Sequence, residues 1–449
     1  MEKDFDLIVI GTGSAGTTVA TRCRKAGWSV AIVDRQPFGG TCSLRGCDPK
    51  KVLVGIAQLV DWSERMHDRG VVTHRLQIDW AELMRFKRTF TDSVSKDRER
   101  AYAQNGISSF HGSARFVGHS LISVGEDLLN AKNIVIASGA KPAPLHVSGE
   151  EHLATSTDFL ELPSLPKRLI FVGGGFISFE FAHVAARAGA DASILEREAR
   201  VLAQFEDELV QRLVQATQER DIKICCSTTV TAIEKTGPEF VVHATRGKEP
   251  LVLRADLVVH GGGRVADIDD LQLEVGGVTR VEAGVDVDEY LQSTSNPAVY
   301  AVGDCAAGGG APLTPVAALE GDVVAENLLN GNKRTANFSG LASMVYALPP
   351  LAMVGLTEDV AREQGLKIRV QSGDSSQWYS SRRGGAKHSA YKIIFDECDK
   401  IIGAHLLGFD AEELANICSL AIRAKVTASA LREVLFAYPT GASELEYML

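Results

Sequence analysis

Short apolar runs that end in glycine-rich turns recur along the chain and predict alternating strands and helices. The first run, Asp6–Ile10, has the pattern of a buried strand, and a glycine-rich turn over residues 11–16 follows it. Thr17–Ala26 then reads as a helix, and Trp28–Val33 is a second apolar run that ends at Asp34. Strands that alternate with helices in this way favour the parallel sheet of an α/β protein.

The order of strand, glycine turn, helix, strand and acid is the dinucleotide-binding fingerprint. Its glycines let the backbone approach a pyrophosphate at a helix N-terminus, where free N–H groups and the helix dipole favour anions. Asp34 is placed to hydrogen-bond a ribose. A glycine turn in an unrelated α/β protein is the weaker alternative, because the pattern is complete. The candidate nucleotide-binding residues of this unit are Gly11, Gly13, Ser14, Ala15, Gly16, Asp34 and Arg35.

The fingerprint occurs a second time, starting with the apolar run Leu169–Val172. A glycine-rich turn, a helix over Phe179–Ala188 and a strand over Asp191–Leu195 follow, and that strand ends at Glu196. A carboxylate there would hold the 2′-OH of NADH and repel the 2′-phosphate of NADPH, which favours NADH weakly. The neighbouring Arg197 and Arg200 keep NADPH open. The candidate residues here are Gly173, Gly175, Phe176, Ile177, Glu196, Arg197 and Gly263.

Two cysteines, Cys42 and Cys47, stand between the two fingerprints, directly after the first. Five residues of regular helix rise roughly 7.5 Å, whereas a disulfide needs Cα atoms about 4.4–6.8 Å apart. A bonded pair therefore requires a broken helix, with Gly46 as the flexible point. Asp48 as a helix cap with Pro49 in the first turn would place Cys47 beside a helix N-terminus, which lowers a thiol pKa.

Two structural interpretations of this cysteine pair remain open beside the redox-active one. The thiols are either two reduced core cysteines or half of a zinc site. Zinc is disfavoured because no second C-x-x-C and no paired histidines complete four ligands, so we expect no metal.

The segment Gly39–Lys51 reads G-G-T-C-S-L-R-G-C-D-P-K-K and resembles the active-site segment of the FAD-dependent pyridine nucleotide–disulfide oxidoreductases. Asp48 stands where that family usually has an aliphatic residue. The resemblance covers nearly the whole chain and implies two Rossmann-like dinucleotide-binding domains, for FAD and NAD(P), and a C-terminal α+β dimerisation domain. The implied boundaries are 1–150 and 291–335 for the two parts of the FAD domain, 151–290 for the NAD(P) domain and 336–449 for the dimer interface.

The resemblance also implies roles for individual residues. Cys42 would be the nucleophile that meets substrate and Cys47 the thiolate next to the flavin, while Lys50 would pair with Glu180 beside the flavin ring. Glu180 as a buried acid paired with any nearby cation is the alternative. Ser178 replaces the third glycine of the second turn, a change that goes more often with NADPH in the family. Further flavin contacts are implied at Gly40, Thr41, Lys50, Ala137, Ser138, Gly139, Gly303, Asp304, Leu313, Thr314 and Ala317.

The C-terminal segment departs from the family pattern. The family carries His-Pro-Thr and a Glu five residues after the His, and that His is the acid/base of thiol–disulfide exchange. Here Tyr438 takes the His position, Ser443 takes the Glu position and Glu444 comes one residue late. A tyrosine, with a reference pKa near 10, is a poor proton shuttle at neutral pH. A leaving group that is already a stable anion would need no such acid.

The remaining patterns and the composition complete the outline. Val52–Tyr102 reads as helices, Gly106–Leu129 as short strands, Tyr391–Phe395 as a strand and Glu412–Lys425 as a helix, while Cys225 and Cys226 read as core residues of one strand over Ile222–Ile233.

The 449 residues are 45% hydrophobic and 23% charged, which is ordinary for a globular protein. A net charge of −10 makes nucleic acid and anionic membrane poor partners. The acidic N-terminus and the cysteine usage favour a cytoplasmic protein.

We therefore expect a homodimeric FAD enzyme that passes electrons from NAD(P)H through Cys42 and Cys47 to a small oxidised acceptor. Three functions compete: a disulfide reductase for a small thiol, a reductase of small electrophiles or metal ions such as hypothiocyanous acid, quinones or Hg(II), and a non-catalytic redox-sensing flavoprotein. The intact cysteine pair, Lys50 and Glu180 argue against the third, and the missing His-Glu dyad separates the first two.

Overall fold

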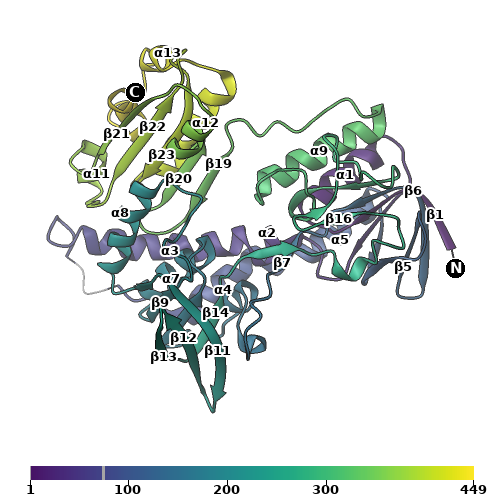
Figure 1. Ribbon diagram of the computed structural model, residues 1–449, viewed down its shortest axis with the longest axis horizontal. Helices are drawn as coiled ribbons and strands as arrows, with labels where there is room; N and C mark the ends of the chain where they lie inside the picture. The colour runs from purple at the N-terminus through teal and green to yellow at the C-terminus, as the bar shows by residue number, and fades with distance from the viewer. Residues whose placement is uncertain (1, 73–75) are drawn as a thin grey trace. The chain divides into compact units, whose positions relative to one another are not determined.

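The computed structural model describes residues 2–72 and 76–449 (Figure 1). The chain forms two compact units, each built from three separate segments. Unit 1 consists of Met1–Lys50, Phe86–Ala143 and Arg264–Phe338, and unit 2 of Lys51–Arg85, Pro144–Gly263 and Ser339–Leu449. None of the helices in the described ranges is long and apolar enough to cross a membrane.

Unit 1 is organised around a seven-stranded sheet with the order β3-β2-β1-β6-β5-β4, in which β18 also pairs with β6. The β1, β2, β3, β6 and β18 ladders are parallel, and β4, β5 and β6 pair antiparallel. The strands are β1 (Glu2–Ile10), β2 (Val30–Asp34), β3 (Ser108–His111), β4 (Ala114–Phe116), β5 (Leu121–Val124), β6 (Asp127–Ile136) and β18 (Val299–Ala301). The helices of this unit include α1 (Ser14–Lys25), α5 (Val94–Gln104) and α9 (Thr314–Asn330).

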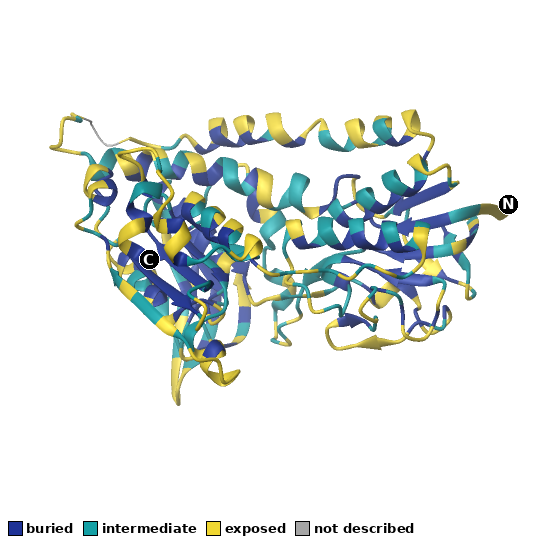
Figure 2. Cartoon of the chain, turned by 90° about the horizontal axis from the view of Figure 1, so that it is seen from above, coloured by how far each residue is buried: buried dark blue, intermediate teal, exposed yellow. Residues whose placement is uncertain are grey.

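The apolar run of β1 is continuous because both faces of this sheet are covered. Leu7 and Val9 pack into one cluster with residues of α1 and α9, whereas Ile8 and Ile10 pack into a second cluster on the opposite face. Strands buried on both faces lose the alternation of apolar and polar residues. Figure 2 shows these strands dark blue over most of their length, whereas the helices carry exposed faces.

The segment before the expected return of the chain also packs with unit 1. The second β1 cluster includes Ile268, Leu271 and Val278, which lie upstream of residue 291. The third segment of unit 1 therefore starts at Arg264.

Unit 2 contains a four-stranded parallel sheet with the order β10-β9-β8-β14, a three-stranded antiparallel sheet and a five-stranded antiparallel sheet with the order β19-β20-β23-β22-β21. The parallel sheet comprises β8 (Arg168–Val172), β9 (Asp191–Leu195), β10 (Lys223–Cys225) and β14 (Leu257–His260). The antiparallel sheets comprise β11 (Thr228–Thr236), β12 (Glu239–Arg246), β13 (Glu249–Ala255), β19 (Ala342–Val345), β20 (Leu351–Gly355), β21 (Arg369–Asp374), β22 (Ala390–Phe395) and β23 (Ile401–Leu407). The helices include α7 (Phe176–Arg187), α8 (Asp207–Gln218) and α12 (Ala411–Ala424).

Several expected elements differ in their bounds. Both nucleotide-loop helices begin three residues earlier than expected, at Ser14 and Phe176, because the glycine before each is extended and the following residues turn at once. Gly303 and Asp304 lie after β18 in a single turn of 3₁₀ helix.

The expected strand over 222–233 is interrupted after Cys225, and β11 starts at Thr228. Cys225 packs with the cluster around β11 and β12, whereas Cys226 packs with the cluster around α7 and α8. The two side chains therefore face opposite sides of the chain, as neighbouring residues of an extended segment do. This separation opposes their use as a second working dithiol.

Candidate redox and nucleotide-binding site

A broken helix carries the two cysteines. Helix α2 (Gly40–Arg45) ends before Gly46, and α3 (Cys47–Arg65) begins directly after it. Gly46 has φ −141° and ψ −118°, and a Cβ there would lie 2.8 Å from the Thr41 carbonyl oxygen. The predicted break at Gly46 is thus present. Asp48 lies inside the first turn of α3 instead of capping it, so Cys47 itself is the first helical residue.

The N-terminus of α9 approaches both thiols in unit 1. The Thr314 hydroxyl oxygen lies 3.2 Å from the Cys42 sulfur and 3.6 Å from the Cys47 sulfur. The Asp48 carboxylate lies 3.9 Å from the Cys42 sulfur. Thr314 is the first residue of α9. The structure therefore brings a hydroxyl, which can donate to either sulfur, to a pair that lies about 270 residues earlier in the chain.

The two thiols have opposite pKa shifts. The pKa of Cys47 falls to about 6, chiefly because Cys42 donates a hydrogen bond to it, with help from Thr314 and the positive charge of Lys50. Burial and the Asp48 carboxylate oppose this shift. The pKa of Cys42 is raised, mainly by the same hydrogen bond to Cys47 and then by burial. At neutral pH the pair therefore holds one thiolate, on Cys47, and one thiol, on Cys42.

The first glycine loop is packed too tightly for side chains. Gly11 has φ +113°, and a Cβ on it would lie 2.1 Å from the Ala137 carbonyl oxygen. A Cβ on Gly16 would lie 2.1 Å from the Gly11 carbonyl oxygen, and one on Gly40 would lie 2.4 Å from the Gly13 Cα. Helix α1 starts at this loop with no side-chain cap and no acid in its first turn. Its N–H groups therefore suit a phosphate, as FAD binding requires.

Other predicted flavin contacts gather at the same place in unit 1. A Cβ on Gly303 would lie 3.4 Å from that of Ala317 and 3.8 Å from that of Ala15. The Gly303 N–H donates to the Glu320 carboxylate over 2.6 Å, and burial raises the pKa of Glu320 to about 7. Directly after β6 come Ala137, Ser138 and Gly139. Thr41 directly precedes Cys42, and Leu313 directly precedes Thr314.

Two arginines that the sequence did not single out lie among these residues. Arg45 and Arg264 are largely enclosed, and burial lowers the pKa of both guanidinium groups. Arg264 donates to the Ala140 carbonyl oxygen and is close enough to Asp304 to oppose the burial that raises the pKa of that acid. Neither arginine forms an ion pair within the described ranges. Enclosed cations without a carboxylate partner fit a diphosphate. The only sequence signal for them is their place, inside C-x4-C and directly after Gly263.

The two acids that end β2 and β9 hold their glycine loops. The Asp34 carboxylate accepts from the Thr12 N–H at 2.9 Å and from the Thr12 hydroxyl at 2.6 Å. The Glu196 carboxylate accepts in the same way from the Gly174 N–H at 2.6 Å and from the Glu198 N–H at 2.8 Å. Each acid, which was predicted to contact a ribose, thus also holds the glycine-rich loop next to it in place.

The basic residues near these acids already have partners. Arg35 forms ion pairs with Asp267 and Asp270, and Arg197 contacts Glu198. Arg200 donates to the carbonyl oxygens of Ala203 and Phe205. These contacts reduce what Arg197 and Arg200 offer to a 2′-phosphate.

The second glycine loop explains how a serine replaces the third glycine. Ser178 is fully buried on α7. A Cβ on Gly261 would lie only 2.0 Å from the Ser178 hydroxyl oxygen. A Cβ on Gly173 would lie 2.3 Å from the Gly261 carbonyl oxygen. Gly261 therefore makes the room that Ser178 takes. Helix α7, like α1, begins with no side-chain cap and no acid in its first turn, which suits a second dinucleotide. Phe176 and Ile177 belong to that turn, and Gly263 ends the segment after β14 with φ +103°.

Lys50 and Glu180 belong to different units. Lys50 lies in the first turn of α3, where its N–H donates to the Gly46 carbonyl oxygen. Glu180 is 3% exposed on α7, and its carboxylate accepts from the Tyr346 N–H at 2.9 Å. Their pairing remains a prediction.

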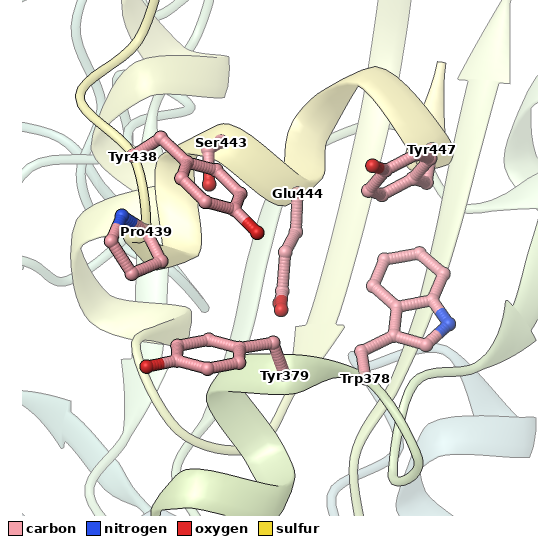
Figure 3. Close-up of a pocket in the computed structure, with 7 residues that line it drawn as sticks. All are labelled: Trp378, Tyr379, Tyr438, Pro439, Ser443, Glu444 and Tyr447. Atoms are coloured by element: carbon pink, nitrogen blue, oxygen red, sulfur yellow. The ribbon is translucent and has the colours of Figure 1, made fainter.

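Tyr438 lines a cavity of about 440 Å³ near the C-terminus of unit 2 (Figure 3). Its side chain is 83% exposed, and its hydroxyl has no hydrogen-bond partner in the described part of the chain. Ser443 forms a reciprocal capping box with Thr440, and Glu444 accepts from the Ser380 N–H at 2.8 Å. No carboxylate in the described ranges therefore orients Tyr438 as a Glu would orient a His.

Comparisons with known proteins agree with this arrangement. A sequence profile for pyridine nucleotide-disulphide oxidoreductases matches residues 5–321, and one for the dimerisation domain of the same family matches residues 341–449. Glutathione reductase of Burkholderia cepacia is 31% identical over 99% of this chain and 98% of its own length. Mercuric reductase of Lysinibacillus sphaericus is 29% identical over 99% of this chain and 82% of its own length.

Solved structures give the same picture. The Cu(II) complex of RclA, an HOCl-induced flavoprotein disulfide reductase from Escherichia coli, superposes with a TM-score of 0.88. The two chains are 26% identical, and 99% of each is covered.

Proposed function

Because the chain belongs to the pyridine nucleotide-disulphide oxidoreductase family, whose members use FAD and NAD(P)H, we propose that it carries electrons through Cys42 and Cys47 to a small oxidised acceptor. The chain is an oxidoreductase of the flavoprotein disulfide reductase type. The observation that carries the proposed route is the position of both sulfurs at the N-terminus of α9, where the Thr314 hydroxyl oxygen lies 3.2 Å from Cys42 and 3.6 Å from Cys47.

The two cysteines have different roles in the proposed electron transfer. Bound FAD would accept a hydride from NAD(P)H and supply two electrons to the cysteine pair. Two electrons and two protons convert the disulfide to a thiol on Cys42 and a thiol that ionises on Cys47. Cys42, after losing its proton, attacks the electrophilic atom of the acceptor and expels one part of it as an anion, which leaves the other part bonded to the Cys42 sulfur. Cys47 then attacks the Cys42 sulfur, expels this second part with the bonding electron pair and restores the disulfide. The low pKa of Cys47 keeps it a thiolate, stabilised by the helix N-terminus and the Thr314 hydroxyl.

The residues around Tyr438 favour an acceptor that needs no acid to release its product. Tyr438 is exposed and has no carboxylate partner in the described ranges, because Glu444 is held by the Ser380 N–H and Ser443 by Thr440. General acid–base catalysis is typically worth about 10²–10⁴-fold in rate. A reductase of small electrophiles or metal ions therefore fits the site better than a reductase of a large thiol disulfide. One relative is named a mercuric reductase and one structural neighbour is a Cu(II) complex, and both support this choice.

NADH is the coenzyme that we favour. Glu196 is fixed at the end of β9 by two backbone N–H groups, and Arg197 and Arg200 are engaged elsewhere. A fixed carboxylate accepts from a 2′-OH and repels a 2′-phosphate.

We also propose that the protein is a homodimer and that it works in the cytoplasm. The C-terminal match is to a dimerisation domain. The eight cysteines of the 449-residue chain lack the spacing of a small disulfide-rich domain, which supports a reducing compartment.

An acceptor panel tests the function. Purified protein reconstituted with FAD is assayed with NADH and with NADPH against glutathione disulfide, lipoamide, Hg(II), Cu(II), quinones and hypothiocyanous acid. We expect turnover of at least one small electrophile or metal ion and slow turnover of glutathione disulfide. Fast glutathione disulfide turnover would favour the disulfide-reductase candidate, and no cysteine-dependent turnover of any acceptor would contradict the proposal.

A further inference from the structure

Asp48 departs from the family pattern and also contacts the cysteine pair. It stands in the first turn of α3, where the family usually has an aliphatic residue. Its carboxylate oxygen lies 3.9 Å from the Cys42 sulfur. An aliphatic side chain there could neither carry a charge nor accept a hydrogen bond from a thiol. The chain therefore has a negative charge beside its sulfur nucleophile that the family pattern lacks.

Neither the helix nor the thiols explain this contact. An acid in the first turn suits the helix dipole, but that preference requires no contact with a sulfur. The Asp48 charge also works against both thiolates. It adds to the rise in the pKa of Cys42, after the larger effects of the hydrogen bond to Cys47 and of burial, and it opposes the low pKa of Cys47. Asp48 therefore does not activate the nucleophile, and its charge is left to act on the molecule that the nucleophile attacks.

An acceptor that bonds to Cys42 comes close to the Asp48 carboxylate. A bond between two sulfurs is about 2 Å long. Because the carboxylate oxygen lies 3.9 Å from the Cys42 sulfur, the attacked atom comes within about 6 Å of that oxygen. This distance is shorter than the Debye length of about 8 Å at physiological ionic strength. A charge near the attacked atom is therefore only partly screened from Asp48.

The Cys42 end of the pair carries the negative potential. The charges that raise the pKa of Cys42 are those of Cys47 and Asp48, and both are negative. The positive charge of Lys50 acts on Cys47. Thr314, which lies within hydrogen-bonding distance of both sulfurs, is uncharged. An acceptor that approaches Cys42 therefore meets an anionic surrounding.

We propose that Asp48 determines the specificity of this enzyme for the charge of its acceptor: the carboxylate beside Cys42 favours cationic and neutral acceptors and repels anionic ones. This role rests on the proposed function, because it requires that Cys42 attacks the acceptor. Metal cations are attracted, and hypothiocyanous acid and quinones carry no charge that Asp48 repels. Glutathione disulfide, which has a net negative charge, is disfavoured. The effect is separate from that of Tyr438, because it acts on the approach of the acceptor and not on the release of the product.

Three aliphatic disulfides that differ in charge test the role of Asp48. Cystamine is cationic, bis(2-hydroxyethyl) disulfide is neutral and 3,3′-dithiodipropionate is anionic. With each, the Cys42 thiolate attacks one sulfur and expels one thiolate, and Cys47 then attacks the Cys42 sulfur and expels the other. The cysteine pair loses two electrons, the disulfide gains them, and the two protons of the pair pass through solvent to the released thiolates.

The measured quantity is the rate at which the reduced cysteine pair of the FAD-loaded protein is oxidised under anaerobic conditions. The remaining Cys42 and Cys47 thiols are alkylated at timed intervals and counted by mass spectrometry. The ratio of the rate with cystamine to the rate with dithiodipropionate is then compared between the wild type and Asp48→Asn. The intrinsic reactivity of the disulfides cancels in this comparison. A changed thiolate fraction cancels as well, because it alters all rates alike.

We expect the ratio to fall about tenfold in Asp48→Asn, since the removed charge attracts one disulfide and repels the other. The rate with the neutral disulfide should change less than this ratio. Asp48→Glu keeps the charge and should keep most of the ratio. Asp127→Asn is the matched control and should keep the wild-type ratio. Asp127 pairs with Lys3 at the start of β6, whereas the Gly11 loop meets Ala137 beyond the other end of that strand.

Ionic strength supplies a second test, which needs no variant. Between roughly 0.01 M and 1 M salt the Debye length falls from about 30 Å to about 3 Å. The wild-type ratio should therefore fall toward that of Asp48→Asn. If Asp48→Asn fails to fold, the salt dependence and Asp48→Glu decide.

Three results would overturn the role of Asp48: a ratio that changes less than about twofold in Asp48→Asn, an equal fall in Asp48→Glu, or a wild-type ratio that does not depend on salt. Cys42→Ser separates this failure from failure of the proposed function. Loss of the Cys47 thiol at the wild-type rate in Cys42→Ser would refute the proposed route and the role of Asp48 with it. Oxidation that depends on Cys42 but not on the charge of the disulfide refutes the role of Asp48 alone.

Discussion

At the scale of single residues, the Thr314 hydroxyl sets the chemistry of the cysteine pair. It lies within hydrogen-bonding distance of both sulfurs and favours the thiolate form of each, next to the larger effect of the Cys42–Cys47 hydrogen bond, which lowers the pKa of Cys47 and raises that of Cys42. The family resemblance suggested only a flavin contact for Thr314. Its distance from Cys42 along the chain, about 270 residues, explains why no spacing rule connects it with the thiols.

Replacement of Thr314 by valine should raise the pKa of Cys47. A hydrogen bond to a charged group contributes about 1.5–3 kcal/mol, or roughly one to two pKa units. Because the hydroxyl is shared by two sulfurs, we expect a rise of about one unit. The rate of iodoacetamide alkylation, measured against pH, reports the thiolate, which forms as pH rises through the pKa. Thr314→Ser keeps the hydroxyl and should keep the wild-type profile; an unchanged profile in Thr314→Val would refute the role.

Restoration of the family dyad should favour disulfide acceptors. Tyr438→His with Ser443→Glu supplies an acid and a carboxylate, and a Glu at the third position of a capping box is compatible with Thr440. Turnover of glutathione disulfide should rise by about 10²-fold, the lower end of general acid catalysis. Turnover of a small electrophile should change little. Steady-state kcat/KM with both acceptors measures the effect, and an equal rise with both would contradict the argument from the leaving group.

At the scale of elements, a charge network joins α3, α7 and the turn that follows α8 in unit 2. The Asp61 carboxylate on α3 accepts from Arg65 and from the guanidinium groups of Arg187 and Arg220, at 2.8 to 3.1 Å. Burial raises the pKa of Asp61, but these cations outweigh it and hold that pKa below its usual value. His183 accepts from Arg187 through Nδ1, and burial lowers its pKa well below the usual value, so it is neutral.

Asp61→Asn should destabilise the protein by about 3–5 kcal/mol, because it leaves the buried guanidinium of Arg187 without its counter-charge. Urea unfolding at pH 7 measures the loss, and Asp92→Asn, an exposed acid, should change stability by less than about 0.5 kcal/mol. The folded-state pKa of Asp61 is depressed, so its contribution is present above the unfolded pKa and disappears as pH falls through the folded pKa. A loss equal to that of Asp92→Asn would show that the network does not hold the helices.

The carboxyl end of β9 should determine coenzyme choice. Glu196→Gln removes the charge and keeps an acceptor for the Gly174 N–H. We expect kcat/KM for NADPH to rise relative to NADH by about tenfold, since repulsion of a phosphate by one carboxylate amounts to roughly 1–2 kcal/mol. A wild-type preference for NADPH, or an unchanged ratio in the variant, would contradict the assignment.

At the scale of the whole molecule, the sequence predicts what is local and misses what the fold brings together. The glycine loops, the break at Gly46 and the strand–helix–strand units of the parallel sheets are predictable because their signals lie within about 30 residues. The family resemblance supplied the domain types, and the comparisons confirm that family and its fold class. The contact of Ser178 with Gly261, the arginines at 45 and 264 and the bond from Ser380 to Glu444 join distant segments, so no local pattern reveals them.

The central claim is that Cys42 and Cys47 are an electron-carrying pair, and an anaerobic reductive titration tests it most directly. The FAD-loaded protein is titrated with dithionite while flavin absorbance and free thiols are followed. The wild type should take up roughly four electrons per FAD, two of them in a cysteine couple that transfers two electrons. Cys42→Ser and Cys47→Ser should each take up roughly two. An uptake of two electrons by the wild type, with no new thiols, would contradict the account.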